Sequence, residues 1–309
     1  MPDTSNTNVP FISFEAGDQI LDWNAVTDAI LAGHRYPRAE IGDTFLRRGP
    51  DTLLSRSAWI DGLGMLTKTA TVIPANTPSI DGGVMLFGDK SGKLEAVIDF
   101  KLLTKWKTVG DSLLGAKLMV SHDVNTILIL GAGTVAGQLI DAFRTKWPDA
   151  EFLIWNRNVE KAQALAEAKE CSFTSKIGKA TGGADIILGA TMTTDPILKG
   201  EWITPGTHVN LIGAYRGDMR EADDELLRLS AIYVDSRATT MDHIGELKIP
   251  LEQGVIEPSD ILGDLYDLQN DQFPNAQDHK VTLFKNGGGA HLDLMVAREI
   301  LRRYQDRAG

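Results

Sequence analysis

The sequence reads Thr126-Ile127-Leu128-Ile129-Leu130-Gly131-Ala132-Gly133-Thr134-Val135-Ala136, an apolar run that leads into a glycine-rich turn. The run predicts a buried strand, and the apolar spacing between Val135 and Phe143 predicts a helix after the turn. The next apolar run, Glu151–Trp155, predicts a second strand, so the segment forms a βαβ unit. Its turn matches the pattern G-x-G-x-x-A in the context that binds a dinucleotide.

Each small residue of this turn has a physical role in that interpretation. Gly131 allows the tight turn, Gly133 allows close approach of a diphosphate, and Ala136 allows close packing of helix on strand. The free amides and partial positive charge of the helix start favour the diphosphate. We therefore expect Gly131, Gly133, Thr134 and Val135 to bind a cofactor. The alternative is a glycine-rich turn that only tightens the packing.

The pattern changes on either side of this unit. Further buried strands are predicted at Ala184–Gly189, His208–Ile212 and Ile232–Asp235, which extends a parallel, doubly wound sheet. Between Thr44 and Phe100, short apolar runs separated by turn residues predict antiparallel hairpins instead. In this range we expect strands at Asp51–Trp59, Gly64–Ile73, Gly83–Phe87 and Leu94–Asp99, with a turn at Lys90–Lys93. Outside it we expect an earlier strand at Pro10–Phe14 and helices from Asp22 to Gly33 and from Thr108 to Met119.

Composition narrows the class of protein. The 309 residues suit about two domains, and the single cysteine, Cys171, cannot form an internal disulfide. A net charge of −11, from 31 basic and 42 acidic residues, disfavours nucleic acid as a partner. The first ten residues resemble no signal peptide, and no apolar run reaches the length of a membrane span. We expect a soluble, cytoplasmic protein that binds neither nucleic acid nor membrane.

The end of the second strand of the βαβ unit bears on the choice of cofactor. An acidic residue at this point would bind the ribose 2′-hydroxyl of NAD, but the chain has Asn156 and Arg157. Arg157 is suited to a charge-assisted hydrogen bond with a 2′-phosphate, so NADP(H) is the preferred cofactor. The alternative is a solvated Arg157 that stacks on adenine, which leaves NAD(H) possible.

Eight motifs in order make the chain similar to the ornithine cyclodeaminase/mu-crystallin family over nearly its whole length. They are Lys68 with Val72–Asn76, Leu103–Thr108, Gly131–Gly133, Ala184–Ile187 with Ala190-Thr191, Pro205–Asn210 with Gly213, Val234–Ser236, Gly245–Leu247 and Phe284–Ala290. The resemblance implies a homodimer that pairs sheets between subunits, and a nicotinamide cofactor that also contacts Ala190 and Thr191. It implies a Rossmann-type domain at 118–285 and an α+β substrate-binding and dimerisation domain at 1–117 and 286–309.

The resemblance also implies a pocket for the carboxylate of an amino or imino acid. Lys68 matches the pocket lysine of the family, and Lys107 stands where many members have arginine, so a point charge replaces a planar fork. Arg56 is the expected substitute for a second pocket arginine, and Gly288 is expected beside the substrate. The alternative for these cations is a solvent-facing role, and Asp81 and Asp111 are candidate partners for them.

One departure from the family bears on the reaction. Cyclising deaminases of this family have Asp two residues after the glycine that matches Gly213, whereas this chain has Tyr215. A tyrosine with a pKa near 10 is a poor base at neutral pH, which counts against ornithine cyclisation. Tyr215 is instead expected to donate a hydrogen bond or to wall the pocket. His243 and His291 are further candidates for proton transfer, with packed or exposed histidines as the alternative.

Together with these residues, the resemblance implies an enzyme, an NAD(P)H-dependent reductase of a cyclic imino acid such as Δ1-pyrroline-2-carboxylate. Lys68 and Tyr215 are the expected catalytic residues, and Arg56, Lys68, Lys107 and Gly288 the expected substrate-binding residues. The proton source stays open among Lys68, a water near Tyr215 and solvent. The alternatives are an ornithine cyclodeaminase with catalytic NAD, an alanine-type dehydrogenase and an NADPH-dependent binding protein. No metal is expected, because no histidines and carboxylates show ligand spacing.

Overall fold

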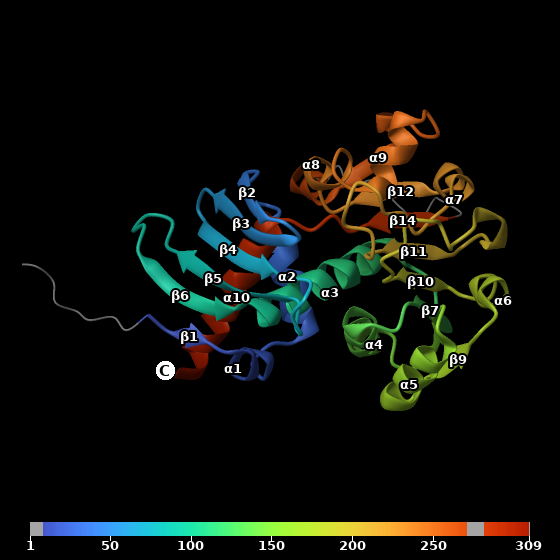
Figure 1. Cartoon of the computed structure of the whole chain (residues 1–309), viewed down its shortest axis with the longest axis horizontal. Helices are drawn as coiled ribbons and strands as arrows, with labels where there is room; N and C mark the ends of the chain where they lie inside the picture. Colours follow the sequence, from blue (N-terminus) through green and yellow to red (C-terminus); the bar gives the residue numbers. More distant parts are fainter. Residues whose placement is uncertain (1–8, 271–280, 309) are drawn as a thin grey trace, which may run out of the picture. The chain divides into compact units, whose positions relative to one another are not determined.

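The computed structural model describes residues 9–270 and 281–308, which form two compact units (Figure 1). Among the described residues, one unit comprises 9–107 and 289–308, and the other comprises 108–270 and 281–288. The first boundary lies inside the long helix α3 (Phe100–Met119), earlier than the expected boundary after residue 117. The second lies after residue 288, where the sequence placed it after 285.

The first unit is built on a six-stranded sheet in the order β1-β6-β5-β4-β3-β2. Neighbouring strands are antiparallel except for β1 and β6, which run parallel. Alternate residues of β4, among them Leu66, Lys68 and Ala70, are buried, and helix α10 packs against β3, β4 and β5. The strands are β1 (Phe11–Ile12), β2 (Glu40–Arg48), β3 (Asp51–Ile60), β4 (Gly64–Val72), β5 (Ile80–Phe87) and β6 (Leu94–Asp99).

The helices of this unit begin at side-chain caps. The Asp22 carboxylate accepts the backbone N–H of Ala25 at 2.8 Å, which confirms the predicted start of its helix. The strand predicted at Pro10–Phe14 is shorter than expected, because Ser13 caps a helix that begins at Phe14. The helices are α1 (Phe14–Asp18), α2 (Trp23–Gly33), the first part of α3 and α10 (Ala290–Ala308).

Helix α3 begins eight residues before the predicted start at Thr108. The Asp99 carboxylate accepts the backbone N–H groups of Lys101 and Leu102 at 2.7 and 2.9 Å, which satisfies two of the amides that a helix start leaves open. Asp99 is also the last residue of β6, so strand and helix follow each other without a loop.

The second unit contains an eight-stranded, fully parallel sheet in the order β13-β12-β14-β11-β10-β7-β8-β9. The chain proceeds from β7 towards β9 on one side and from β10 towards β13 on the other, so it is doubly wound. This confirms the expected fold class, an α/β fold with a Rossmann-type parallel sheet. The strands are β7 (Thr126–Leu130), β8 (Glu151–Trp155), β9 (Ser172–Thr174), β10 (Ile186–Gly189), β11 (His208–Leu211), β12 (Ala231–Val234), β13 (Ile261–Asp264) and β14 (Thr282–Lys285).

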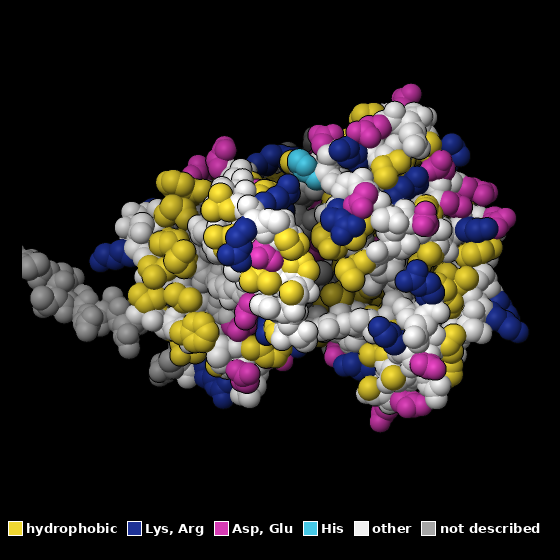
Figure 2. Space-filling model, in the orientation of Figure 1, with side chains coloured by type: hydrophobic (Ala, Val, Ile, Leu, Met, Phe, Trp, Pro, Cys, Tyr) yellow, Lys and Arg dark blue, Asp and Glu magenta, His cyan; other side chains and the backbone are white. Residues whose placement is uncertain are grey.

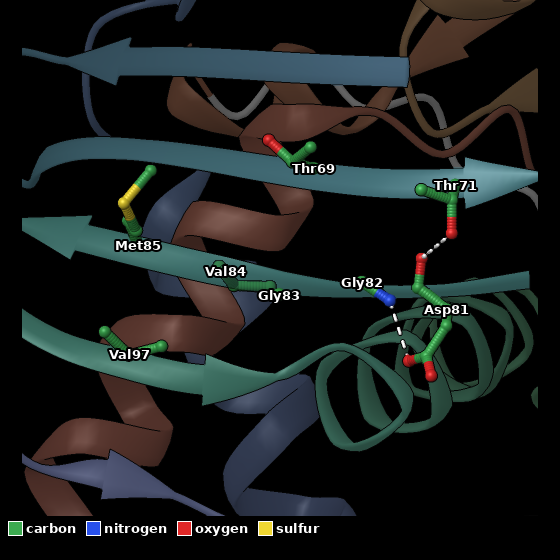
Figure 3. A pocket seen from close by; sticks show the side chains of 8 residues that line it. All are labelled: Thr69, Thr71, Asp81, Gly82, Gly83, Val84, Met85 and Val97. Atoms are coloured by element: carbon green, nitrogen blue, oxygen red, sulfur yellow. Dashed lines mark hydrogen bonds between the residues drawn. The ribbon is translucent and has the colours of Figure 1, made fainter. Parts of the chain in front are cut away.

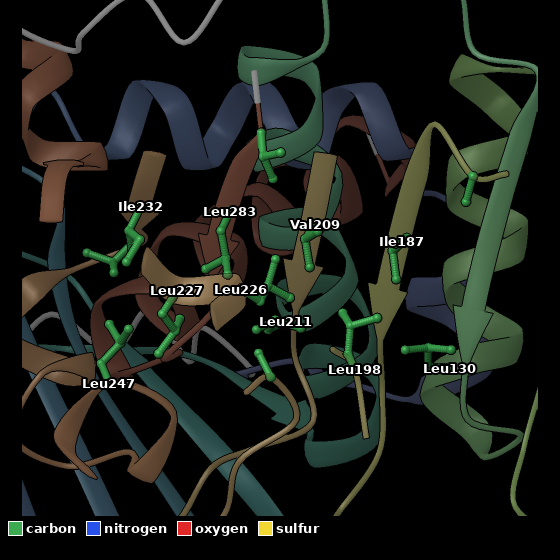
Figure 4. Packing of buried hydrophobic residues seen from close by; sticks show 14 of the residues in the cluster. Leu130, Ile187, Leu198, Val209, Leu211, Leu226, Leu227, Ile232, Leu247 and Leu283 are labelled. Carbon is green, nitrogen blue, oxygen red and sulfur yellow. The ribbon is translucent and has the colours of Figure 1, made fainter. Parts of the chain in front are cut away.

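Helices and a large apolar core complete this unit. Leu130, Ile187, Val209, Leu211 and Leu283 point from neighbouring strands into one cluster (Figure 4). The α-helices are α4 (Thr134–Lys146), α5 (Val159–Lys169), α6 (Ile177–Thr181), α7 (Asp224–Leu229), α8 (Arg237–Thr240) and α9 (Gly245–Glu252). The 3-10 helices are η1 (Gly200–Trp202), η2 (Pro258–Asp260) and η3 (Leu265–Asn270).

The described residues show neither a membrane-spanning helix nor a metal-binding cluster. Within 9–270 and 281–308, no helix is both long enough and apolar enough to cross a lipid bilayer. The same residues contain no group of three or more His, Cys, Asp or Glu side chains placed to hold a metal ion.

Candidate functional site

The glycine-rich turn has the backbone shape that a dinucleotide requires. Gly131 has φ +123°, and a Cβ there would lie 2.7 Å from the Ala190 carbonyl oxygen, so only glycine fits. Gly133 is the N-cap of α4 and makes no side-chain cap, and a Cβ at Gly133 would meet no atom within 4 Å. The first amides of α4 therefore border open space, as binding of a diphosphate demands.

This turn lies at the topological switch point of the sheet, where the order in which the chain adds strands reverses. Strands β7 and β10 are neighbours, but the chain leaves them towards opposite edges of the sheet. Ligands of doubly wound sheets bind beyond the carboxyl ends of the strands at such a point. Ala190 and Thr191 follow β10 directly, so the structure brings them next to the Gly131 turn.

The turn after β11 lies against the turn after β10. A Cβ on Gly213 would be 1.8 Å from the Thr191 carbonyl oxygen and 2.4 Å from its nitrogen. No side chain fits between these two turns, so their backbones are in direct contact. The turns after β7, β10 and β11 thus form one continuous backbone cradle.

The residues after β8 occupy the other side of the Gly131 turn. Asn158 caps α5 by accepting the N–H of Lys161 at 3.0 Å, and the Asn156 amide donates to the Asn158 carbonyl at 2.9 Å. Arg157 between them is exposed. In the described part of the chain, no ion pair or hydrogen bond engages its guanidinium, so it is available to an anionic ligand.

Buried charges stand behind the cradle, at the carboxyl ends of β11 and β14. Lys285 is fully buried and donates to the carbonyl oxygens of Leu211, Ala214 and Asn286 at 2.9, 2.9 and 2.7 Å. Burial lowers the pKa of Lys285, and the charges of Glu246 and Glu221 oppose that effect. All three protons of the ammonium are thereby used to fix backbone.

The carboxylates around Lys285 also bind backbone. Glu246 accepts the N–H groups of Glu221 and Ala222 at 2.7 and 2.9 Å. Asp235 accepts those of Gly287 and Gly288 at 2.9 and 2.5 Å. Burial raises the pKa of Glu246 to about 7 and that of Asp235 to about 6. Gly288, predicted to contact substrate, is thus held by Asp235 and has φ +69°.

The raised pKa of Glu246 predicts a pH-dependent stability. A carboxyl group whose pKa is higher in the folded state contributes its full stabilisation at pH values below its ordinary pKa of 4.5. That contribution disappears as the pH rises through about 7. The full loss is roughly 3 kcal/mol, because one pKa unit corresponds to about 1.4 kcal/mol. We expect urea unfolding to show this decline between pH 5 and pH 8, and the Glu246→Gln variant to show a smaller one, because the pKa of Asp235 is also raised, to about 6. Equal pH slopes for the two proteins would contradict the assignment.

The first unit holds a buried ion pair on the helix-covered face of its sheet. The Lys68 ammonium donates to the Asp293 carboxylate at 3.1 Å and to the Thr104 hydroxyl at 2.9 Å. The Phe100 ring lies 4.6 Å away, close enough for a cation–π contact. Burial lowers the pKa of Lys68, and the charge of Asp293 opposes this. Burial alone would raise the pKa of Asp293, but Lys68 and Lys107 outweigh it and lower the pKa.

Two more cations lie near this pair within the first unit. Arg56 is directly opposite Lys68 in the β3–β4 register and forms an ion pair with Asp43 of β2 at 2.9 Å. Lys107 is buried, and its charge acts on both Lys68 and Asp293. In residues 9–270 and 281–308, no hydrogen bond or ion pair engages the Lys107 ammonium. The structure therefore brings the three predicted substrate cations together, with the Lys107 ammonium available to an anion.

The partners named from the sequence for these cations are wrong. Asp81 accepts the backbone N–H of Gly82 at 2.8 Å, and Asp111 accepts the amide of Asn286 at 2.5 Å. Arg56 pairs with Asp43, and Lys68 pairs with Asp293. Asp293 was missed because it is separated from Lys68 by more than two hundred residues, and only the folding of α10 onto the sheet unites them.

Tyr215, His243 and His291 are the remaining catalytic candidates. Tyr215 is 56% exposed, and the neighbouring Arg216 forms an ion pair with Asp218 at 2.9 Å. His243 is exposed. His291 is fully buried with its ring edge-on to His34 at 5.6 Å, and burial holds its pKa well below 6.5. His291 is therefore neutral at neutral pH, which does not suit a general acid.

Comparison with known proteins agrees with this architecture. The profile of the ornithine cyclodeaminase/mu-crystallin family matches residues 64–308. The chain belongs to this family. It is 44% identical to the Δ1-pyrroline-2-carboxylate reductase of Paracoccus denitrificans (strain Pd 1222) over 303 residues, which cover 94% of this chain and 96% of that protein.

One further relative and one solved structure extend the comparison. The ketimine reductase mu-crystallin of Mus musculus is 35% identical over 72% of this chain and 69% of its own. The structure of Thermococcus litoralis Δ1-pyrroline-2-carboxylate reductase in complex with NADH and L-proline superposes with a TM-score of 0.86 at 22% identity, covering 96% of this chain and 98% of that chain. The family resemblance seen in the sequence is thus confirmed.

Proposed function

We propose that this family member reduces a cyclic ketimine carboxylate, with Δ1-pyrroline-2-carboxylate as the first candidate and a six-membered analogue as the second. The observation that carries the proposal is the 44% identity, over nearly the whole of both chains, to a Δ1-pyrroline-2-carboxylate reductase. The resemblance to a ketimine reductase supports the same reaction class, reduction of C=N by an oxidoreductase. The cations of the first unit and the backbone cradle of the second are suited to the two kinds of binding that this reaction needs.

The cations of the first unit have the chemistry to bind the substrate carboxylate. Lys107 is free to form a charge-assisted hydrogen bond, and Arg56 adds positive potential from the neighbouring strand. Lys68 is fixed in direction by Asp293 and Thr104, so its charge requires no reorganisation when substrate binds. Together, their positive charges attract the carboxylate of an iminium zwitterion and so orient the substrate.

The cradle of the second unit has the chemistry to bind NADPH. The amides at the start of α4 suit the diphosphate, and Arg157 suits the 2′-phosphate. When bound, the nicotinamide supplies the hydride that adds to the C=N carbon and yields a cyclic secondary amine. The protein contributes mainly orientation and electrostatics, since a protonated imine accepts hydride readily.

The first experiment follows NADPH absorbance in the presence of Δ1-pyrroline-2-carboxylate, with NADH measured in parallel. We expect oxidation of NADPH that depends on the imine, with a slower NADH reaction. Ammonia-dependent oxidation with an acyclic 2-oxo acid, and none with the imine, would point to an alanine-type dehydrogenase. Tight NADPH binding with no oxidation by any imine would point to a binding protein.

Arg157 provides a test of the proposed cofactor preference. The Arg157→Asp variant loses a charge-assisted contact to the 2′-phosphate and adds a repulsive charge. We expect its Kd for NADPH to rise about ten- to a hundredfold, as loss of 1.5–3 kcal/mol implies, with little change for NADH. Equal losses for the two cofactors, measured by calorimetric titration, would show that Arg157 does not contact the 2′-phosphate.

We also propose that a second copy of the chain covers the outer face of the six-stranded sheet. This face carries the exposed side chains of Phe11, Leu46, Leu53, Trp59 and Met85, and hydrophobic side chains gather over these strands in Figure 2. Gly83 leaves a hollow there between β4, β5 and β6, lined by Thr69, Gly82 and Met85 (Figure 3). A continuous, partly apolar face of this kind is typical of a subunit interface.

Two leucines of similar exposure test the dimer. Leu53 lies on the outer face and is 40% exposed, whereas Leu229 of the second unit is 38% exposed. We expect the Leu53→Asp variant to be monomeric by light scattering, because a buried unpaired charge opposes association. The Leu229→Asp variant serves as the control and is expected to stay dimeric. A dimeric Leu53→Asp variant would place the interface elsewhere.

A further inference from the structure

The hydroxyl of Thr191 is held by a buried carboxylate. The backbone N–H and the hydroxyl of Thr191 both lie within hydrogen-bond distance of Glu221 Oε1, at 2.8 and 2.7 Å. Glu221 Oε2 accepts the N–H of Gly213 at 2.7 Å. Glu221 is fully buried and thus joins the turns that follow β10 and β11.

The direction of these hydrogen bonds fixes the polarity of Thr191. The Gly213 and Thr191 amides can only donate, and an ionised carboxylate can only accept. Although burial raises the pKa of Glu221, its contacts with three donors are those of a carboxylate. A hydroxyl has one proton, and that of Thr191 is used on Glu221. Towards any ligand, Thr191 therefore presents oxygen lone pairs only.

The position of Thr191 in the sheet indicates which part of a dinucleotide it meets. The diphosphate site is the switch point between β7 and β10, and Arg157 marks the β8 side as the side of the adenosine 2′-phosphate. The other half of a dinucleotide then extends towards the ends of β10 and β11. Thr191 lies there, next to the Gly131 turn through Ala190, and it is only partly buried.

We propose that the Thr191 hydroxyl accepts a hydrogen bond from the carboxamide N–H of the nicotinamide, and that Glu221 is a positioning residue that fixes the hydroxyl for this role. The inference rests on the proposed function insofar as the cofactor is a nicotinamide dinucleotide. Of the nicotinamide, ribose and diphosphate groups, only the carboxamide NH₂ and the ribose hydroxyls can donate. A cofactor analogue separates these two donors.

The test compares binding of NADPH with that of its 3-acetylpyridine analogue, in which a methyl group replaces the carboxamide NH₂. The variants are Thr191→Val, which keeps the shape and removes the hydroxyl, and Thr191→Ser, which keeps the hydroxyl. We expect the wild-type protein and Thr191→Ser to bind NADPH about three- to tenfold more tightly than the analogue, and Thr191→Val to bind the two equally. We expect Glu221→Gln to lose part of the preference, because its amide NH₂ can donate to the hydroxyl.

A fragment without nicotinamide controls for folding. 2′-Phospho-ADP-ribose is expected to bind all four proteins with the same Kd, measured by calorimetry. An unchanged preference for NADPH in Thr191→Val would overturn the proposal, and so would an equal loss of affinity for NADPH and for the analogue. The measurement needs no imine, so a protein that reduces no ketimine but shows the expected preference would refute the proposed function alone. A protein that binds no nicotinamide dinucleotide would refute both.

Discussion

Lys68→Met is expected to lower kcat/KM for imine reduction by about 10²- to 10⁴-fold, the range lost when a positioned acid or its charge is removed. Lys68 lies opposite Arg56 of β3 and forms an ion pair with Asp293 of α10. Its charge is held in place before substrate binds, so methionine removes electrostatic stabilisation that solvent does not replace. Steady-state kinetics with NADPH and Δ1-pyrroline-2-carboxylate provide the measurement.

The same variant leaves the Asp293 carboxylate buried without its partner, which costs about 3–5 kcal/mol in stability. The double variant Lys68→Met with Asp293→Asn removes that unpaired charge. We expect it to recover most of the thermal stability and none of the activity. A double variant that regains activity would show that Lys68 acts only through folding. NADPH affinity is the control and is expected to be unchanged in both variants.

Local sequence patterns were sufficient to predict the elements whose determining residues are adjacent in the sequence. The run Thr126–Leu130 and the turn after it became β7 and the start of α4 as expected. The reason is that a parallel strand is apolar throughout and its turn needs glycine at φ +123°. The Asp22 cap was predictable for a similar reason, since the cap and the helix that it begins are adjacent in sequence.

Elements stabilised only by distant partners escaped prediction. Strand β2 is exposed along its whole length, so it shows no alternation of apolar residues and is defined only by its register with β3. Strand β14 lies between β11 and β12, although it follows both in the sequence. No local pattern encodes such an insertion.

The candidate site divides in the same way. The candidates Gly131, Gly133 and Arg157 lie on one βαβ unit, so their spacing alone is enough to propose them. The residues that hold the site were missed, because Glu221 binds Thr191 across thirty positions and Lys285 binds Leu211 across seventy-four. Asp293, Glu221 and Lys285 are also charged residues in a buried setting, where composition alone predicts an exposed surface.

Lys285→Met is expected to destabilise the protein by about 3–5 kcal/mol, because it removes a buried positive charge that acts on Glu246, Glu221 and Asp235. The carbonyl oxygens of Leu211, Ala214 and Asn286 also lose their shared donor. The matched control is Lys248→Met, which affects only a 3.9 Å ion pair with Glu252 on the surface and is expected to cost less than about 0.5 kcal/mol.

The pH dependence of this loss separates charge from packing. Without Lys285, the pKa values of Glu246 and Asp235 rise further, so at pH 5 these groups are neutral and the missing charge matters little. At pH 8 they must ionise in a buried site with no counter-charge. We therefore expect the difference in unfolding free energy between the wild-type protein and Lys285→Met to be larger at pH 8 than at pH 5. An equal difference at both values would mean that Lys285 contributes through its hydrogen bonds to backbone and not through its charge.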